Sequence, residues 1–446
     1  MRILDWNQLD DAGRRDALRR PAQENRDDIT AGAREIVSAV RRDGDDAIRK
    51  FTERFDKVRI AELEVPKSEF AAARRTLTSV QIAALERAIE NVSTFHAAQL
   101  PKGLSLETMP GVKCERVIRP IDAVGLYVPA GSAPLPSAVV MLAIPALLTG
   151  CGRRVLCSPP GRDGNANASV LVAAEMCGVE TVFRIGGAQA IAALAYGTQS
   201  VPKVDKIFGP GNAWVTAAKQ WVANDPDGAA CDMPAGPSEV LVIADDTARA
   251  EFVAADLLAQ AEHDPQSQAI LVTPSLAFAE AVSKATTAQM ATLSRQAILE
   301  QSVAASRCIV VSSIEEAFAV SNRYAPEHLI VQIREPRRWL DKIRNAGSVF
   351  LGEWSPEPMG DYCSGTNHVL PTYGYARAYS GLSVLDFVKQ ITVQELSPDG
   401  LRSLGPVAVT LSELEGLDAH TAAVARRLAV LSGDATESRL RSGARR

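Results

Sequence analysis

Histidine and its polar neighbours are the residues of this 446-residue chain whose types and spacing best suit chemistry. The chain has five histidines. Four of them stand beside carboxylates or amides, at Gln260-Ala-Glu-His263, Glu327-His328, Asp361 with His368, and Glu415 with His420. Because histidine is the commonest metal ligand and titrates nearest to neutral pH, these islands indicate a metal site, an acid/base site, or both. The fifth, His96, has no acidic neighbour, and no chemistry is expected of it.

Gln260 and His263 are three residues apart in a predicted helix that ends near His263, because Pro265 follows. That spacing places the two side chains on one face of the last helical turn. A polar helix end that simply faces water is an equally good interpretation of these residues alone. The pair Glu327-His328 lies at a helix-to-strand junction. We expect the pair at the carboxyl end of a parallel sheet, where catalytic groups collect.

Two further islands add oxygen and nitrogen donors. The stretch from Gly360 to His368 is dense in donors and acceptors and has no apolar anchor, which is typical of a functional loop. Within it, Asp361 would supply the hard anionic oxygen that balances a divalent cation. Glu415-Gly-Leu-Asp-Ala-His420 lies between two predicted helices. Together the islands offer two imidazoles, an amide oxygen and a carboxylate, a mixed set that suits zinc or another borderline divalent metal.

The alternation of β-rich runs with helical runs predicts the fold that positions these islands. Residues 1 to about 120 are expected to be mostly helical. From residue 123, four strands alternate with four helices, which predicts a parallel sheet covered by helices. The same rhythm restarts at Glu239 and continues to Leu351. The chain from about Gly381 is expected to be helical and to end in the basic amphipathic helix from Thr421 to Leu431.

Two glycine turns each follow a predicted strand and open a helix, at Arg184-Ile-Gly-Gly-Ala-Gln189 and Phe208-Gly-Pro-Gly-Asn212. Glycine lets a phosphate or ribose approach the backbone, and a helix N-terminus favours anions. Neither turn completes the G-x-G-x-x-G pattern, since Trp214 stands where the third glycine of the second turn belongs. A nucleotide site and an ordinary tight turn of a doubly wound sheet are therefore both open interpretations.

The composition argues against a nucleic-acid surface and a membrane span. A hydrophobic content of 46%, a charged content of 23% and a net charge of -5 are those of a globular protein, and no block of Lys and Arg stands out. The longest apolar run, Ser137 to Cys151, is broken by Pro145 and is too short to cross a bilayer. Seven cysteines without CxxC spacing, and an N-terminus without a signal segment, predict reduced thiols in the cytoplasm.

Longer ordered motifs join the islands and the glycine turns into one pattern, and this pattern resembles the histidinol dehydrogenase family over nearly the whole chain. One small departure is Ala130, where the family commonly has glycine. The motifs that carry the resemblance are Gly125-Leu-Tyr-Val-Pro129, Ser132-Ala-Pro-Leu-Pro136, Ile185-Gly-Gly-Ala-Gln-Ala190, Lys206-Ile-Phe-Gly-Pro-Gly-Asn212, Asp232-Met-Pro-Ala-Gly-Pro-Ser-Glu239, Gln260-Ala-Glu-His263, Ala325-Pro-Glu-His328, Gly360-Asp-Tyr-Cys-Ser-Gly-Thr-Asn-His-Val-Leu-Pro371 and Glu415-Gly-Leu-Asp-Ala-His420.

The resemblance implies a role for each island. The residues that match the family's zinc ligands are Gln260, His263, Asp361 and His420. Glu327 and His328 match its acid/base pair. The residues that match its substrate contacts are Ser238, Glu415 and the residues already named at positions 260, 263, 328, 361 and 420, with His368 a weaker candidate. The residues that match its NAD contacts are Tyr127, Gln189 and Asn212.

The resemblance also implies an architecture and a reaction. The expected fold has two incomplete Rossmann-like parallel-sheet domains with small helical terminal segments, in a domain-swapped homodimer with shared active sites. The expected reaction oxidises L-histidinol through L-histidinaldehyde to L-histidine and reduces two NAD, in the last steps of histidine biosynthesis. The expected divisions are an arm of residues 1–25, a first domain of 26–126 with 239–382 that carries the metal and acid/base residues, an NAD-side domain of 127–238, and a segment of 383–446 that reaches the partner subunit.

Three other classes of protein use some of the same residues. A metal-dependent hydrolase would need the same ligands and base but no cofactor, and the paired glycine turns weigh against it. A dehydrogenase of the sulfopropanediol type shares the core, but the motif from Glu415 to His420 favours a substrate with an imidazole and an amine. A binding protein without catalysis would have little need of the Glu327-His328 pair.

Overall fold

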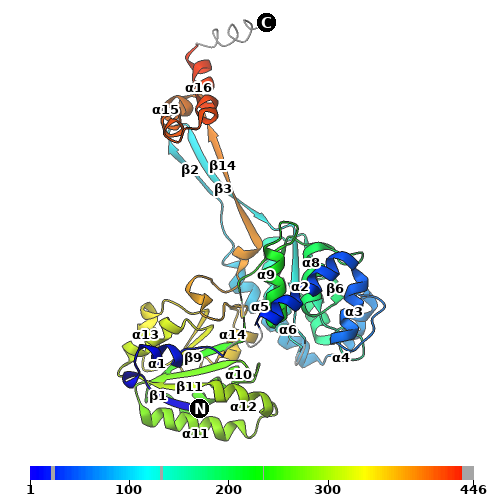
Figure 1. Ribbon diagram of the computed structural model, residues 1–446, viewed down its shortest axis with the longest axis vertical. Helices are drawn as coiled ribbons and strands as arrows, with labels where there is room; N and C mark the ends of the chain where they lie inside the picture. Colours follow the sequence, from blue (N-terminus) through cyan, green and yellow to red (C-terminus); the bar gives the residue numbers. More distant parts are fainter. Residues whose placement is uncertain (22–25, 131–133, 235, 434–446) are drawn as a thin grey trace. The chain divides into compact units, whose positions relative to one another are not determined.

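The computed structural model describes residues 1–21, 26–130, 134–234 and 236–433, and the described chain forms two units (Figure 1). The first unit consists of residues 1–100 and 121–387, and the second of residues 101–120 and 388 onwards. Ser132, Ala133 and Ala235, which belong to the family motifs, lie outside the described residues.

The first unit contains a five-stranded parallel sheet in the order β6-β5-β4-β7-β8. Counted along the chain, this order is third, second, first, fourth and fifth, which is that of a doubly wound sheet. Helices pack on both faces, so every residue of the central strand β4 is buried. The predicted alternation of strands and helices is confirmed. The elements are β4 (Ala123–Tyr127), α6 (Pro136–Thr149), β5 (Arg153–Ser158), α7 (Ala168–Met176), β6 (Thr181–Arg184), α8 (Gly187–Tyr196), β7 (Lys206–Phe208), α9 (Ala213–Ala223) and β8 (Ala230–Cys231).

The first unit also contains a six-stranded parallel sheet in the order β1-β11-β10-β9-β12-β13. Apart from the edge strand β1 (Arg2–Asp5), its strands repeat the order of the smaller sheet. The remaining elements are β9 (Glu239–Ala244), α10 (Ala250–Ala261), β10 (Gln268–Thr273), α11 (Leu276–Met290), α12 (Gln296–Ala305), β11 (Arg307–Val310), α13 (Ile314–Tyr324), β12 (His328–Gln332), β13 (Ser348–Leu351) and α14 (Glu357–Tyr362).

The N-terminal region contributes elements to both sheets, and the expected domain boundaries stay predictions. Residues 2–5 form β1 and pair with β11, and α1 (Asp11–Ala17) follows them. The helices between residues 26 and 97 pack mainly on the five-stranded sheet and its helices. Asn91 and His96 of the last of them also contact Cys363 and Asn367. Gly44 separates the first two of these helices, because its φ of +57° is outside the helical range. These helices are α2 (Arg26–Asp43), α3 (Asp45–Phe55), α4 (Lys67–Thr76) and α5 (Ser79–Ala97).

The second unit contains an antiparallel sheet in the order β14-β3-β2, followed by two helices. The prediction of helix before residue 120 and after residue 381 is therefore wrong for these strands. They are largely exposed, so they lack the apolar alternation that marks a half-buried strand. The partners in this pairing are also far apart in the sequence. The elements are β2 (Leu104–Met109), β3 (Val112–Pro120), β14 (Val388–Leu396), α15 (Pro398–Leu414) and α16 (Asp418–Ser432).

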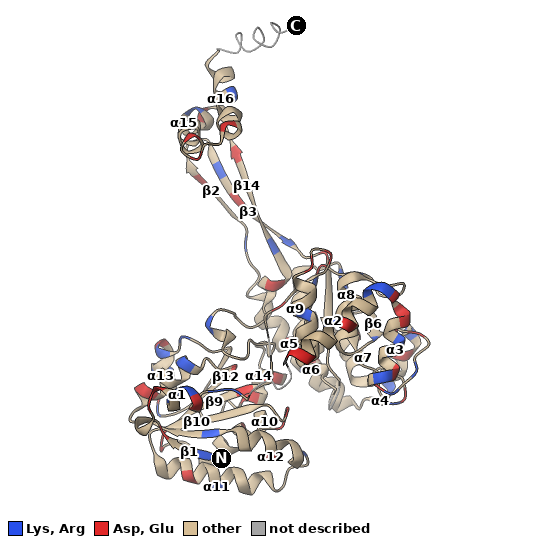
Figure 2. Ribbon diagram, viewed as in Figure 1, with Lys and Arg blue, Asp and Glu red and all other residues tan. Residues whose placement is uncertain are grey.

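Lys and Arg are interspersed with Asp and Glu over the outer helices, for example on α3 and α4 (Figure 2). The helix most apolar in the sequence, α6, is buried over most of its length against the five-stranded sheet. Among the described residues, no helix has both the length and the apolar character needed to cross a membrane.

Candidate functional site

The acid/base candidates lie at the amino edge of the six-stranded sheet. His328 is the first residue of β12 and stands in register with Val240 and Ser348, near the starts of β9 and β13. Glu327 precedes it, and both side chains are buried. The expectation that this pair lies at the carboxyl end of the sheet is therefore wrong. The left-handed Ala325, with a φ of +56°, ends α13 and turns the chain into the start of β12.

The metal-ligand candidates come from two helix ends that meet at the same edge. Gln260 is in the last turn of α10, and His263 follows the helix end, as predicted. Asp361 lies in α14, so the stretch expected to be a loop begins as a short helix. Donor atoms of His263, Glu357 and Asp361 all lie within 4.8 Å of one another. The structure thus brings His263 and Asp361 together and adds Glu357 to them.

Glu357 is the site residue that the sequence analysis missed. It is the first residue of α14, and Asp361 lies four positions later on the same face of that helix. Pro356 caps the helix and Pro358 lies in its first turn, where proline is well tolerated. A Glu-x-x-x-Asp spacing directly after a helix-starting proline could have identified this second carboxylate.

The backbone of one residue, Glu239, orients both members of the acid/base pair. The backbone N–H of Glu239 donates to Glu327 Oε2 at 2.8 Å, and His328 Nδ1 lies 3.2 Å from the carbonyl oxygen of Glu239. Because a carbonyl oxygen can only accept, Nδ1 must carry the proton. This contact leaves Nε2 of His328 to face Asp361 Oδ1 at 3.5 Å and Glu357 Oε1 at 3.9 Å.

A buried ion pair fixes Glu239 itself. Arg20 contacts the Glu239 carboxylate through Nε and through Nη2, the latter at 2.8 Å, and the guanidinium lies 4.0 Å from the centre of the Tyr324 ring. The backbone N–H of Tyr373 donates to the same carboxylate at 2.9 Å. Arg20 comes from the N-terminal stretch, so residues far apart in the chain set the position of the Glu239 peptide.

The pKa values at this edge reflect burial and crowding of carboxylates. Burial raises the pKa of Glu327 to about 8, against the opposing effect of His328. Burial opposes the charged form of His328, but Glu327, Asp361 and Glu357 outweigh it and raise its pKa to about 10. Burial also raises the pKa of Glu357. A neutral His328 at pH 7, which a general base requires, therefore needs this negative charge to be compensated.

The residues at this edge fit a divalent metal. Gln260 Oε1, His328 Nε2 and Glu357 Oε1 are buried, and none makes a hydrogen bond with the described residues. Buried polar atoms are normally paired, so these atoms indicate a missing partner of positive charge. An imidazole, two carboxylates and an amide oxygen are suitable ligands for zinc. A cation bound there would also neutralise the charge that raises the pKa of His328.

The other predicted substrate and metal residues fall into two groups. Ser238 directly precedes β9, and His368 Nδ1 lies 2.8 Å from the carbonyl oxygen of Asp361, so both are in the first unit beside the site. Glu415 and His420 are exposed in the second unit, at the end of α15 and in the first turn of α16. Their roles as substrate contact and metal ligand stay predictions.

The predicted NAD contacts lie at the carboxyl edge of the five-stranded sheet, where β4 and β7 are neighbours and the chain order of the strands reverses. The Tyr127 hydroxyl accepts from Gly187 N at 3.0 Å, so the first glycine turn is attached to the end of β4. Tyr127 and Gln189 are buried, whereas Asn212 is exposed and caps α9 through Trp214 N and Val215 N. The contacts themselves stay predictions.

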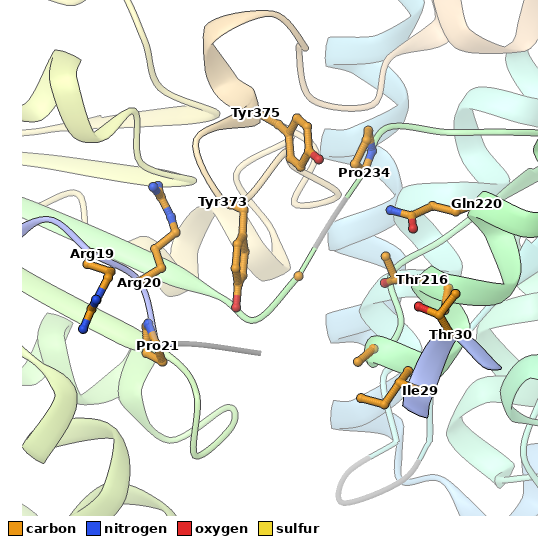
Figure 3. Close-up of a pocket in the computed structure, with 13 residues that line it drawn as sticks. Arg19, Arg20, Pro21, Ile29, Thr30, Thr216, Gln220, Pro234, Tyr373 and Tyr375 are labelled. Carbon is orange, nitrogen blue, oxygen red and sulfur yellow. The ribbon is translucent and has the colours of Figure 1, made fainter. Parts of the chain in front are cut away.

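A cavity of about 450 Å³ is lined by residues of α9, the helix that follows the second glycine turn, and by the segment that carries Arg20 (Figure 3). Figure 3 shows Arg20 and Tyr373 on one wall and Thr216 and Gln220 of α9 on the opposite wall, with Pro234 between them. The cavity thus joins the part of the first unit that carries the acid/base pair to the part that carries the glycine turns.

Comparison with known proteins gives one consistent result. The histidinol dehydrogenase family model matches residues 18–428. The histidinol dehydrogenase of Vibrio cholerae is 54% identical over 428 residues, which cover 96% of this chain and 98% of that one. The histidinol dehydrogenase of Xanthomonas euvesicatoria is 54% identical over 96% of this chain and 100% of that one. The crystal structure of histidinol dehydrogenase from Elizabethkingia anophelis superposes with a TM-score of 0.93 at 44% identity, over 97% of this chain and 99% of that one. With this match along nearly its whole length, the chain belongs to the histidinol dehydrogenase family.

Proposed function

We propose that this protein oxidises L-histidinol to L-histidine through L-histidinaldehyde, as the last steps of histidine biosynthesis. The observation that carries the proposal is the Glu327-His328 pair, oriented by the backbone of Glu239 and facing the donor cluster, in a chain of this family. L-Histidinol, two NAD⁺ and one water become L-histidine, two NADH and protons. NAD supplies the hydride acceptor in each of the two oxidations.

His328 takes the proton in the alcohol step. Its Nδ1 is committed to the Glu239 carbonyl oxygen, so Nε2 is the atom that can accept the hydroxyl proton. Removal of that proton lets the carbon release its hydride to the first NAD⁺. The 3.2 Å contact keeps the ring orientation constant while the proton is transferred, which a free imidazole in water could not do.

Glu327 activates water in the aldehyde step. One carboxylate oxygen, Oε2, accepts from the Glu239 N–H, and the other is assigned to the water. A water that loses its proton to Glu327 adds to the aldehyde carbon, and the resulting hydrate releases its hydride to the second NAD⁺. Because Glu327 is buried, bulk water does not compete with the one that reacts.

Zinc would be held by Gln260, His263 and Asp361 of one chain together with His420, and would orient the imidazole and amine of the substrate. The orphaned Gln260 Oε1 and the convergence of His263 with Asp361 support this set. Ser238 and Glu415 would contact the substrate. Glu357, within the same cluster, would hold Asp361 and His328 in place or complete the metal site.

NAD would bind at the carboxyl edge of the five-stranded sheet, near Tyr127, Gln189 and Asn212. The neighbouring cavity and the two glycine turns support this place. The seven cysteines are free thiols, which supports a cytoplasmic location.

The second unit supports a homodimer with shared sites. No residue of α16 is buried, and Leu414 and Val430 are 79% and 65% exposed. A three-stranded sheet with two helices that leaves so many apolar side chains uncovered needs a further surface to pack against. A second copy of the chain would cover them, and its His420 and Glu415 would complete the active site of its partner.

The test is turnover of L-histidinol with NAD, followed at 340 nm, together with elemental analysis. Two NADH should form for each L-histidinol consumed. Chelation should abolish turnover, and zinc or manganese should restore it. Full activity in a preparation shown to be free of metal would refute the metal assignment, and product formation without NADH would indicate a hydrolase instead.

A further inference from the structure

A buried ion pair between Lys219 and Asp232 lies beside the second glycine turn. Lys219 belongs to α9, and Asp232 directly follows β8. Their side chains are 11% and 2% exposed. Burial raises the pKa of Asp232, and Lys219 and the Gly209 N–H oppose that effect. Neither residue touches the donor cluster, and the proposed mechanism gives neither a role.

The pair holds the peptide groups on both sides of Gly209. The N–H of Gly209 donates to Asp232 Oδ2 at 2.7 Å, and its carbonyl oxygen accepts from Lys219 Nζ at 2.7 Å. Gly209 has a φ of +121°, and a Cβ there would lie 2.0 Å from the carbonyl oxygen of Tyr127. The turn is therefore pressed against the end of β4 and fixed in a conformation that only glycine adopts readily.

The same pair connects two walls of the cavity. Thr216, Ala217 and Gln220 of α9 line it, and Lys219 is on that helix. Pro234 lines the cavity two residues after Asp232. A shift of either partner would therefore move α9, the Gly209 turn and the stretch at Pro234 relative to one another.

Stability alone is a weak reason for this arrangement. A buried ion pair is often no more stabilising than apolar residues of the same volume, because both charges lose their hydration. The pair does fix the orientation of the Gly209 backbone, since each charged group binds one polar atom of Gly209. That is the property needed to hold a backbone turn that a dinucleotide approaches closely.

We propose that Lys219 and Asp232 are positioning residues for the dinucleotide, which hold α9, the Gly209 turn and the Pro234 stretch of the cavity in the geometry that NAD requires. This inference rests on the proposed function. It extends that function to two residues that lie outside the family's metal, acid/base and substrate sets described above.

The chain offers a matched control in Glu69. Glu69 also binds one backbone N–H, that of Ala166 at 3.0 Å, and one buried cation, Arg184 at 2.7 Å. Its side chain is 18% exposed, and it joins α4 to the far strand of the same sheet. Glu69→Gln therefore removes a similar carboxylate without affecting the Gly209 turn.

The experiment measures NADH binding by fluorescence and steady-state kinetics on the zinc-loaded full chain. The variants are Asp232→Asn, the double variant Lys219→Met/Asp232→Asn, which leaves no lone buried charge, and Glu69→Gln. The double variant should bind NADH about tenfold more weakly and raise the KM for NAD by a similar factor. Its KM for L-histidinol and its zinc content should stay at wild-type values. Asp232→Asn should show a smaller effect, because Lys219 can still donate to the carbonyl oxygen of Gly209.

Three outcomes would overturn the inference. One is wild-type NADH affinity in the double variant. Another is a loss of affinity in Glu69→Gln equal to that of the double variant. The third is a fall in zinc content and histidinol affinity together with NADH affinity, which would mean general unfolding. If the wild-type protein itself neither bound NADH nor reduced NAD with L-histidinol, the proposed function would fail instead, before any variant was compared.

Discussion

The two parallel sheets of the first unit have the same strand order but use opposite edges. In the six-stranded sheet, Glu327, His328 and the donor cluster gather at the amino ends of the strands. In the five-stranded sheet, both glycine turns lie at the carboxyl ends. The general rule for open α/β sheets places ligands at the carboxyl edge. The proposed NAD site of the smaller sheet would follow this rule, whereas the donor cluster of the larger sheet does not.

Helix dipoles give a physical reason for the difference. At the amino edge of such a sheet the covering helices end, and helix C-termini carry partial negative charge that favours cations. The last turn of α10 carries Gln260 there, directly before His263. At the carboxyl edge the helices begin, and α8 and α9 direct their N-termini towards any anion bound there. The same architecture therefore offers a cation edge and a phosphate edge.

The largest expected effect follows substitution of the acid/base pair at the amino edge of the six-stranded sheet. Glu327→Gln should slow oxidation of L-histidinaldehyde by about 10²–10⁴-fold and the alcohol step much less, because only the aldehyde step needs activated water. His328→Asn should slow the alcohol step by a similar factor. Rapid-quench measurement of each step separates the two. If Glu327→Gln oxidised L-histidinaldehyde at the wild-type rate, the water-activating role would be wrong.

The next largest effect tests whether the second unit of a partner chain supplies His420 to the site at this amino edge. His263→Asn and His420→Asn should each be inactive alone. In a mixed dimer, one site takes residue 263 from the His420→Asn chain and residue 420 from the His263→Asn chain, so that site carries neither substitution. Random equal mixing should therefore restore up to about a quarter of the active sites.

Subunit exchange must be confirmed by mass in that experiment. A mixture that exchanges and regains no activity would show that His420 serves its own chain. Mixing either variant with a copy that carries both substitutions is the matched control. That mixture should regain no activity, because every site in it carries at least one of the two substitutions.

The sequence predicted the elements of both sheets well, because their apolar runs are fully buried strands, as in β9 and β10. It did not predict which edge of the larger sheet carries the site, because that depends on where β12 begins relative to β9, a long-range register. The partnership of Arg20 with Glu239 spans 219 positions and leaves no local pattern. Glu357 was missed for a different reason. Its spacing from Asp361 is visible in the sequence, but the stretch that begins at Gly360 was expected to be a loop. The two carboxylates were therefore not recognised as neighbours on one face of a helix.

A moderate effect should follow loss of the ion pair behind the acid/base pair. Arg20→Met with Glu239→Gln removes both charges and keeps a side chain at position 239 that can still bind Tyr373 N. We expect kcat to fall about tenfold, because the backbone of Glu239 no longer fixes Glu327 and His328. The surface variant Arg249→Met, which breaks an exposed pair with Glu353 at 3.0 Å, should leave kcat unchanged. An equal loss in both would contradict the positioning role.

The smallest expected effect concerns Asp56, a partly buried carboxylate near the carboxyl edge of the five-stranded sheet. Asp56 ends α3, and its charge acts on Tyr127 at this edge. Its Oδ2 is buried without a hydrogen bond to any described residue, and burial raises its pKa to about 6. Because the pKa of Asp56 in the folded state is above the unfolded value of 3.8, protonation of Asp56 favours the folded state. The stability of the fold therefore falls as the pH rises from about 4 through about 6.

Asp56→Asn should therefore stabilise the protein at pH 7 by about 1–2 kcal/mol, a value reduced for the partial exposure of the side chain. Near pH 4 the variant and the wild type should melt together. Asp163→Asn is the matched control of opposite sign. Hydrogen bonds from Asn165 lower the pKa of Asp163, so that carboxylate favours the folded state at neutral pH and loses its effect as the pH falls. Melting curves across pH 4 to 8 would distinguish the two. An Asp56→Asn variant that melted at a lower temperature than the wild type at pH 7 would show that the Asp56 charge stabilises the folded state, contrary to this prediction.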